Sequence, residues 1–437
     1  MEIRLMDVKE FSKMKKDPSW MRRFREKAFE IIKEKKYEVP WDQYVDVEKL
    51  VIEGKNIGEV GSLKEIPQDV ATLLDKLGIP ESERPLLIGL SINVDNELIY
   101  KMVKKDLEKR GVTLMSTEEA VQKYDWLKDY FMKLVRPDMS AAAAYHAAFW
   151  SGGIFIHVPE NVRVDYPLQA YFLIISEGLS QTEHTLIILE NNSYLNYIEG
   201  CAAPVLARYS VHLGALEAFV KDGANLVVKS LENWIGNVHH RPMKGVYVGK
   251  NATVDMSSIT LGGKTAVMKP RVYLEGENSR GVLRSVSLVN KDRIVISGGY
   301  IENKMPKTSS ELLNRGVVMD EGKEFFKGEI FVRKTAKGAK GHMECNTILI
   351  GDKAYSEAIP VLKTELDDVE LSHEATLGKI GEDQLIYLES MGFDEEQAYS
   401  LIVNGFFNGW LIFPPKENFE IKLKYSTQAN LLYAFLI

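Results

Sequence analysis

The sequence predicts a mainly β protein, with a long central region of stacked short strands between a helical or mixed α/β region and a helical tail. After about residue 150, β-branched and aromatic segments alternate with Gly, Asn and Asp turns, as in "HTLIILENNSYLNYIEG". A turn, a small residue and a strand also recur, at Ser193, Ala224 and Ala252, with nearly equal spacing. Repeats of this kind bury their apolar faces against one another. The period fits a parallel β-helix and a β-sandwich equally well.

Composition narrows the classes of protein to consider. The chain has 437 residues, 27% of them charged, and a net charge of −7, which argues against a general nucleic-acid binder. No apolar run approaches the ~18 residues that a membrane span needs. The polar start "MEIRLMDVKEFSKMKKD" does not resemble a signal peptide. We therefore expect a cytoplasmic protein that binds neither membrane nor nucleic acid.

Residues 1–138 are predicted to form an N-terminal helical or mixed domain. Within residues 18–40, Met21, Phe24 and Ala28 fall on one face of a helix. In the stretch from Lys13 to Lys36, basic residues clearly outnumber acidic ones. It is either a patch for nucleic acid or a partner, or a solvated helix face, and the acidic total favours the solvated face.

Residues 371–437 are predicted to form a C-terminal helical region. Gly392 stands in the position of a helix C-cap. Asp394 and Gln397 have capping-box spacing at the start of a second helix. The stripe expected to be buried in that helix is Ala398, Leu401, Ile402 and Gly405.

The segment "LSHEATLGKI", residues 371–380, begins like a zinc-protease motif. H-E-x-x-H needs two histidines four positions apart, and Leu377 follows His373 at that position. A protease-type zinc site is therefore excluded. The alternative for His373 and Glu374 is a surface pair at the start of a helix.

The chain has two cysteines, Cys201 and Cys345, too few for a disulfide framework. Each is either a small buried residue or a thiol with a separate role. His373 and Glu374 follow Cys345 by about one repeat. One repeat moves a side chain only ~4.8 Å on a stacked parallel sheet, so Cys345 and His373 or Glu374 are predicted to share one small site. Cys201 is about five repeats away, roughly 25 Å, too far for a bridge.

A thiolate beside imidazole and carboxylate is a mixed set of soft and hard ligands. Four cysteines hold an iron–sulfur cluster firmly, so one cysteine with nitrogen and oxygen ligands is expected to hold it weakly. A protein that builds clusters and passes them on needs such an exchangeable site.

The region from about residue 140 to 408 resembles SufB and SufD, the scaffold subunits of Suf-type iron–sulfur cluster assembly. The resemblance rests on "FWSGGIFIHVPENVRVDYPLQAYF", "YIEGCAAP", "PKTSSELLNRGVV", "KGAKGHMECNTILIGD" and "LSHEATLGKIGEDQLIYLESMGF", which occur in the family's order. The presence of both cysteines and the His-Glu pair makes the chain resemble SufB more than SufD. One departure is Ser372, where SufB often has Glu.

The resemblance implies a right-handed parallel β-helix over residues 139–370. It implies a scaffold, not an enzyme, that binds a transient iron–sulfur cluster at Cys345 with His373 and Glu374. Sulfur from a cysteine desulfurase or from sulfide would enter at Cys201. The C-terminal helices would dock a SufC-like ABC-type ATPase, and the chain would pair with itself or with a SufD-like subunit.

Three alternatives remain open at this stage. One is a SufD-like supporting subunit without its own cluster. A second is a β-helix carbohydrate-active enzyme. Its catalytic carboxylates would come from the segment "ELDDVE", residues 365–370. The third is a nucleic-acid binder acting through the basic N-terminal helix.

Overall fold

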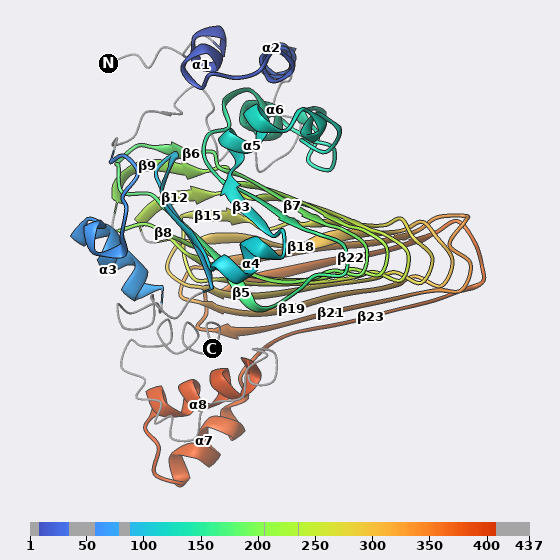
Figure 1. Cartoon of the computed structure of the whole chain (residues 1–437). Helices are drawn as coiled ribbons and strands as arrows, with labels where there is room; N and C mark the ends of the chain where they lie inside the picture. The colour runs from blue at the N-terminus through green and yellow to red at the C-terminus, as the bar shows by residue number, and fades with distance from the viewer. Residues whose placement is uncertain (1–7, 35–56, 78–87, 205, 235, 408–437) are drawn as a thin grey trace.

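The computed structural model describes residues 8–34, 57–77, 88–204, 206–234 and 236–407. Its centre is a β-solenoid of about eight turns, so the predicted parallel β-helix is confirmed. Helices lie at both ends of the described chain (Figure 1). The predicted helix bracket at Pro40 and the unassigned tail from Gly409 onward lie outside the described residues. None of the described helices is long and apolar enough to cross a membrane.

Two large sheets form the walls of the solenoid. The first runs in the order β2 (Glu97–Val103), β1 (Gly89–Val94), β5 (Arg163–Leu173), β8 (Tyr194–Ala202), β11 (Asn225–Asn233), β14 (Thr253–Thr260), β17 (Arg280–Val289), β19 (Ser309–Met319), β21 (Ala339–Ile350) and β23 (Val369–Lys379). The second contains β3 (Thr113–Ser116), β4 (Ile154–Val158), β7 (His184–Leu189), β10 (Ala215–Val220), β13 (Met243–Val248), β16 (Arg271–Leu274), β18 (Ile294–Asn303), β20 (Lys323–Val332) and β22 (Tyr355–Thr364). A shorter row of β6 (Ser180–Gln181), β9 (Leu206–His212), β12 (Gly236–His240) and β15 (Thr265–Val267) joins the second sheet at β18.

The sequence repeat corresponds to one turn of the solenoid. Asn225 pairs in parallel with Thr253 on the next turn, and Thr253 pairs in the same way with Arg280 on the turn after that. Further along, Ser309 pairs in parallel with Lys340. The sandwich alternative is wrong, because the strands of the repeat pair in parallel with the following turn.

The cross-section of the solenoid narrows at β18. The first residues of β18, Ile294 to Ile296, pair with β15, whereas Tyr300 to Asn303 pair with β16. Turns before this point have three strands, and turns after it have two. Gly298, with φ of +122°, and Gly299 lie at the junction between these pairings. A side chain at Gly298 would overlap the backbone of Lys327 on the next turn, so glycine is required there.

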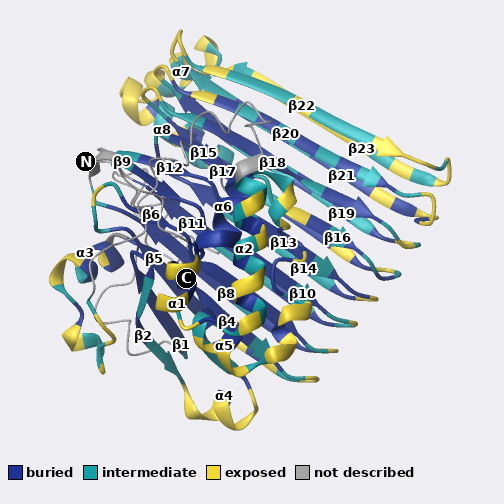
Figure 2. Ribbon diagram, turned by 90° about the horizontal axis from the view of Figure 1, so that it is seen from above, coloured by how far each residue is buried: buried dark blue, intermediate teal, exposed yellow. Residues whose placement is uncertain are grey.

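The last turn of the solenoid is much less buried than the turns before it. Along β21 buried and half-buried residues alternate, while β22 and β23 have no buried residue (Figure 2). In the described part of the chain, β22 and β23 have strand partners on one side alone. β23 continues to Lys379, so residues 371–379 belong to the solenoid and the C-terminal helices begin at Glu382.

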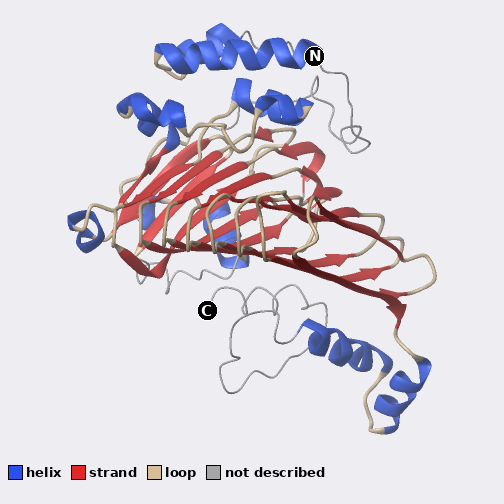
Figure 3. Cartoon of the chain, turned by 90° about the vertical axis from the view of Figure 1, so that its right-hand side faces the viewer, coloured by secondary structure: helices blue, strands red, loops and turns tan. Residues whose placement is uncertain are grey.

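Helices cover the second sheet and the start of the first. The described helices are α1 (Val8–Met14), α2 (Ser19–Glu34), α3 (Gln68–Lys76), α4 (Lys105–Lys109), α5 (Thr117–Lys123), α6 (Ala141–Phe149), α7 (Glu382–Ser390) and α8 (Glu395–Phe407), with 3₁₀ turns η3 (Leu63–Glu65), η5 (Asp125–Asp129) and η6 (Pro137–Met139). Figure 3 shows α1 and α2 in an outer layer above α6, which lies on the solenoid. α3 packs on the outer face of the first sheet.

One buried cation fixes the N-terminal helices to the body. Met21 and Ala28 are buried as predicted, and Arg25 on the same helix is buried too. Arg25 Nε donates to Asp17 at 2.7 Å, and Nη1 donates to the carbonyls of Ala148 and Trp150 at 3.0 Å. Burial lowers the pKa of Arg25, and Asp17 offsets part of that effect. At least one basic residue of this helix is therefore buried in the protein and does not contribute to a solvated basic face.

The C-terminal hairpin has the predicted caps but a different buried face. Gly392 has φ of +97°, and the backbone nitrogens of Asp394 and Gln397 receive reciprocal side-chain hydrogen bonds at 2.9 and 2.8 Å. The predicted buried stripe is wrong beyond Ala398, because Leu401 is 48% exposed. The buried residues of α8 also include Val403 and Phe407, which pack against the end of the first sheet.

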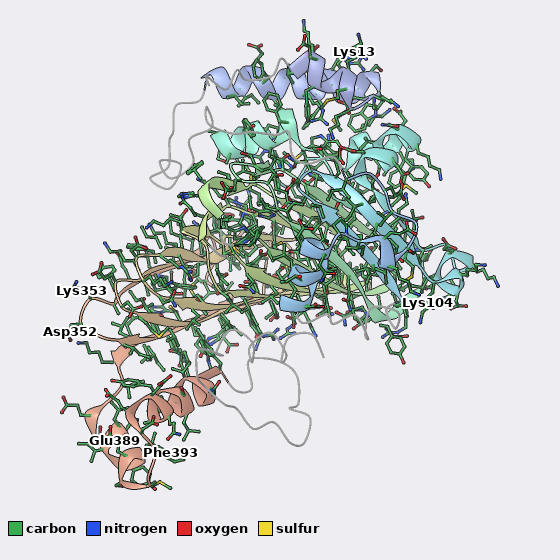
Figure 4. The ribbon with its side chains drawn as sticks, turned by 90° about the vertical axis from the view of Figure 1, so that its left-hand side faces the viewer. Lys13, Lys104, Asp352, Lys353, Glu389 and Phe393 are labelled. Atoms are coloured by element: carbon green, nitrogen blue, oxygen red, sulfur yellow. The ribbon has the colours of Figure 1, made fainter. Side chains whose placement is uncertain are left out.

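The Arg25–Asp17 pair predicts a strong effect of a single substitution. Asp17→Ala leaves the buried guanidinium without its carboxylate, which costs about 3–5 kcal/mol for a pair of this kind. We expect a clearly lower midpoint in urea unfolding followed by tryptophan fluorescence. Lys13→Ala is the matched control, because Lys13 is exposed on α1 (Figure 4) and its loss costs within about 0.5 kcal/mol. Equal midpoints for Asp17→Ala and wild type would contradict the assignment.

Candidate functional site

Both cysteines lie inside the solenoid. Cys201 on β8 is 2% exposed, and Cys345 on β21 is 1% exposed. Both are free thiols. Five steps from strand to strand separate β8 from β21, so at ~4.8 Å a step the thiols lie roughly 24 Å apart along the axis. This agrees with the sequence estimate.

Polar side chains form two columns that link the cysteines along the interior of the first sheet. In the first column, Glu199, Ser230, Ser258, Ser285, Asn314 and Cys345 pair in register from turn to turn. In the second column, Cys201, Glu232, Thr260, Ser287, Gly316 and Thr347 pair in register. A core of stacked strands is normally apolar, so a polar row through it needs internal hydrogen bonds.

Cys201 lies among buried charges. Glu232 occupies the matching position on the next turn, and Glu199 lies on the same face of β8 as Cys201, separated from it by Gly200 alone. The ammonium of Lys244 donates to Glu199 and to Ser230, and lies 3.7 Å from Glu232. Burial, then the carboxylates of Glu232 and Glu199, raise the pKa of Cys201 well above its ordinary value. Cys201 is therefore a neutral thiol in this state.

A chain of buried histidines continues from Glu232. His240 Nε2 lies 3.3 Å from Glu232 Oε2, and its Nδ1 lies 2.9 Å from Nδ1 of His212. His212 Nε2 lies 2.6 Å from Glu183 Oε1. Burial lowers the pKa of His212, but the carboxylates of Glu183, Glu232 and Glu199 together raise it overall. The pKa of His240 is lowered by burial and by His212, so the pKa values of the two adjacent imidazoles are shifted in opposite directions.

Cys345 lies beside a buried carboxylate. Glu324 accepts hydrogen bonds from Thr347 at 3.0 Å and from Asn314 at 3.3 Å. Asn314 Nδ2 also lies 3.8 Å from the Cys345 sulfur. Gly316 leaves the space that Glu324 fills, since a Cβ there would overlap its carboxylate. Burial, then the charge of Glu324, raises the pKa of Cys345 to about 12.

The structure brings the predicted ligands only partly together. Cys345 pairs with Ala375, Met343 with His373, and Glu344 with Glu374. Because side chains alternate along a strand, His373 lies on the inward face with Cys345, one inward position away, and Glu374 lies on the outward face. Both belong to a strand and are exposed, so the alternative of a pair at a helix start is wrong. Among the described residues, no group of three His, Cys, Asp or Glu side chains is arranged to hold a metal ion.

Sequence reasoning missed Glu199, Glu232, Lys244 and Glu324. A signal for one of them was present. Glu232 stands one repeat after Cys201, just as Asn314 stands one repeat before Cys345. A charged residue that follows a cysteine by one repeat occupies the same inward position on the next turn, and this spacing is the signal for the interior polar row. Glu324 comes from the opposite sheet, and the repeat does not reveal it.

These features define a class: a β-solenoid flanked by helices, with two buried thiols that mark opposite ends of two adjacent polar columns. Two family descriptions match the chain. Residues 172–406 match "SUF system FeS cluster assembly, SufBD core domain", and residues 85–170 match "SufBD protein N-terminal region". The chain therefore belongs to the SufBD family, whose role is iron–sulfur cluster assembly.

Relatives cover almost the whole chain. An iron–sulfur cluster assembly SufBD family protein of Pyrococcus horikoshii is 39% identical over 427 residues, 95% of this chain and 94% of the relative. A SufBD family protein of Staphylococcus haemolyticus is 34% identical over 438 residues, 98% of this chain and 91% of the relative. A third, from Staphylococcus aureus strain MRSA252, is 33% identical over 438 residues, again 98% of this chain and 91% of the relative.

The surroundings of Cys345 predict that its thiol reacts slowly with alkylating reagents. In a Cys201→Ser variant, where Cys345 is the single cysteine, we expect alkylation by iodoacetamide at pH 8 to be about a thousandfold slower than for a thiol of ordinary pKa 9.0. The rate should rise with pH towards 12. Glu324→Gln removes a negative charge that disfavours the thiolate, so the pKa should fall and the rate at pH 8 should increase severalfold.

Glu329→Gln is the matched control, because Glu329 lies on the outward face of β20 and should leave the rate unchanged. Mass spectrometry of the alkylated peptide measures the rate. A Cys345 that reacts at pH 8 as fast as free cysteine would refute the buried, protonated thiol.

Proposed function

We propose that this chain is a SufB-like scaffold on which an iron–sulfur cluster is assembled at Cys345 and from which it is transferred. The observation that carries the proposal is the register of the first sheet, in which Cys201 begins one polar column and Cys345 ends the column beside it, five turns further on. A supporting subunit without a cluster has no need of such a row. The chain acts as a scaffold, and turnover chemistry belongs to its partners.

Sulfur enters at Cys201 and reaches Cys345 through the interior. Glu199, Lys244 and Ser230 form a hydrogen-bonded group beside Cys201, and Asn314 stands beside Cys345. Such hydrogen-bonding groups accommodate a neutral thiol or a proton in transit better than an apolar core does. The donor is a cysteine desulfurase or sulfide.

The ligands at Cys345 assemble when the last turns of the solenoid adjust. His373 is on the same face as Cys345, so it is the nearer second ligand, while Glu374 must turn from the outward face. A thiol with a pKa near 12 must also lose its proton to bind iron. Because neither β22 nor β23 has a buried residue, this last turn is the part of the wall that moves most readily. The iron–sulfur cluster is cargo, held transiently.

The C-terminal hairpin supplies a surface for a SufC-like ABC-type ATPase. Ile386 and Tyr387 on α7 are 63% and 64% exposed, and Met391 after it is 60% exposed. An apolar patch of this kind marks a protein interface. Figure 4 shows Glu389 and Phe393 at the outer end of this hairpin, away from the solenoid. ATP-driven movement of the partner would thus act on the hairpin that directly follows β23.

Pairing with a second subunit, either another copy or a SufD-like chain, uses the open last turn. The outer edges of β22 and β23 offer backbone groups of the kind that pair with another chain. Ile359 on β22 and Leu377 on β23 are each 40% exposed. A subunit placed there lies close to Cys345 and His373 and shields a cluster from water. We place the complex in the cytoplasm, away from membrane and nucleic acid.

The carbohydrate-enzyme alternative loses its support. Two of its carboxylates are in ion pairs with solvated basic residues, Glu365 with Arg333 at 3.4 Å and Glu370 with Lys340 at 2.7 Å. Glu365, in the turn after β22, and Glu370, on β23, are thus exposed carboxylates already engaged in ion pairs. Whether the chain binds a cluster distinguishes the SufB-like role from the SufD-like alternative.

Cluster assembly gives the deciding measurement. After anaerobic purification and reconstitution with iron and sulfide, we expect a broad absorbance near about 400 nm, which thiolate-bound clusters produce. Cys345→Ser should abolish it, and His373→Ala should reduce cluster content and lifetime more than Glu374→Gln. Cys201→Ser should retain the cluster when sulfide is supplied in excess, because Cys201 serves delivery.

A wild-type chain that takes up no iron, alone or with its partner ATPase, would shift the chain to the SufD-like role. Full cluster content in Cys345→Ser would remove Cys345 from the site.

Docking of the ATPase is tested separately. The double substitution Ile386→Glu/Tyr387→Glu places two charges in an exposed apolar patch, so it should weaken co-purification with the ATPase at least about tenfold without unfolding the chain. Lys340→Glu/Lys353→Glu, at exposed positions of the solenoid, is the matched charge-changing control. Undiminished co-purification of the α7 variant would place the docking surface elsewhere.

A further inference from the structure

A groove of about 380 Å³ lies on the outer face of the solenoid, outside the site described above. One wall comes from the N-terminal region around η6 and α6, including Val135 and Met139. The floor comes from β16, β18 and β20 of the second sheet. Its inner end is formed by residues 241–244, which comprise the turn after β12 and the first two residues of β13. The fold thus forms a concave site between the N-terminal region and the solenoid.

The groove is strongly basic on an acidic protein. Its basic residues are Arg241, Lys244, Lys269, Arg271 and Lys327, and Glu329 is the one acidic residue of the described lining. The whole chain has a net charge of −7. A cleft lined with one sign of charge focuses its field and concentrates ions of the opposite sign. The contrast between the groove and the whole chain favours binding of an anion in the groove.

The charges in the groove are close enough to affect one another. Burial, then the charges of Arg271 and Lys327, lower the pKa of Lys269. Arg241, at the inner end, is 7% exposed, and Lys244 beside it is 8% exposed with its ammonium paired to Glu199 inside the solenoid. Cations placed together and partly withdrawn from water are stabilised by a bound anion.

The floor is shaped to keep the groove open. Arg271 lies over the ring of Tyr300, with the guanidinium carbon 5.0 Å from the ring centroid. Next to Tyr300, Gly299 and Gly328 pair in register and line the groove with backbone. A Cβ at either glycine would point into the solenoid and crowd core side chains such as Leu283 and Phe326. This pair of glycines lies beside the point where three strands per turn become two.

The residues at the inner end of the groove also line small cavities inside the solenoid. Pro242 and Lys244 line both the groove and a cavity of about 10 Å³ that contains Cys201. Together with Lys269 they also line a cavity of about 20 Å³ that contains Ser230, Ser258 and Ser285 of the polar row. Lys244 is the common element, because its ammonium already contacts Glu199 and Ser230 inside.

We propose that this basic groove binds small sulfur anions of the hydrosulfide or thiosulfate class and is the external entrance to Cys201 and the polar row. Lys244 and Pro242 form the gate between groove and interior. The inference rests on the proposed function, since it names the chemical class that arrives at Cys201. It concerns binding and passage, and no covalent step is part of it.

A small anion fits the groove better than a macromolecule. The positive residues line a single concavity instead of an extended stripe along the surface, as nucleic acid needs. Two of the cations are buried at its inner end, where a protein surface does not reach. The cavities behind Lys244 hold about one water-sized group, so a larger anion passes only when the wall at Lys244 and Pro242 opens.

Binding is tested with thiosulfate by isothermal titration calorimetry on the full chain. Arg271→Gln/Lys327→Gln removes two cations from the floor, and we expect the Kd to rise about tenfold or more. Lys340→Gln/Lys353→Gln removes the same charge from exposed positions of the solenoid and should leave the Kd within about twofold. No measurable thiosulfate binding, or equal losses in both double variants, would overturn the anion site.

Entry is tested by the chemistry of Cys201 in a Cys345→Ser background. Its rate of reaction is compared for two methanethiosulfonates, one with an anionic sulfonatoethyl group and one with a neutral methyl group. We expect the anionic-to-neutral rate ratio to fall about tenfold in Arg271→Gln/Lys327→Gln and to fall with added salt in wild type. An unchanged neutral rate shows that the fold is intact. An unchanged ratio would overturn the entrance.

These measurements are independent of cluster assembly. A chain that assembles no cluster but shows groove-dependent thiosulfate binding fails the proposed function and keeps the anion site. A chain that assembles clusters normally when thiosulfate binding is absent keeps the proposed function and loses the entrance.

Discussion

The structure depends on one constraint, the stacking of parallel strands in register from turn to turn. Each inward side chain lies about 4.8 Å from its counterpart on the next turn, so residues one repeat apart become neighbours. Apolar residues in this arrangement make a continuous core that no turn has alone. Polar residues obey the same geometry, and Cys201 to Thr347 and Glu199 to Cys345 become columns. The internal row is thus a direct result of the stacking.

The repeat predicted the turns of the solenoid but not the face of each side chain. Its period was sufficient to place Cys345 next to the strand that carries His373 and Glu374. Turn lengths vary from one repeat to the next, however, and a shift of a single position reverses the face. Glu374 therefore lies outside while Cys345 lies inside. The sequence has no local signal for the exact length of a turn, so this detail appears only in the folded chain.

Tertiary packing explains two further differences. The caps of α8 were predictable because Asp394 and Gln397 act within one turn of helix. The buried face of α8 was not, because Val403 and Phe407 are chosen by contact with the first sheet. Arg25 likewise seemed to belong to a solvated basic face. Its two carbonyl partners, at Ala148 and Trp150, are far away in sequence, so no local pattern reveals them.

The two ends of the solenoid differ in how they terminate. At the N-terminal end, β1 pairs with β2 and β4 with β3 in antiparallel fashion, and helices cover the adjacent faces. At the C-terminal end, β22 and β23 leave parallel edges available in the described part of the chain. Head-to-tail stacking would join unlike edges and has no natural stopping point. Joining two C-terminal ends about a twofold axis consumes both available edges at once. The asymmetry of the ends thus means that a second chain pairing at these edges would lie beside the last turns, near Cys345 and away from Cys201.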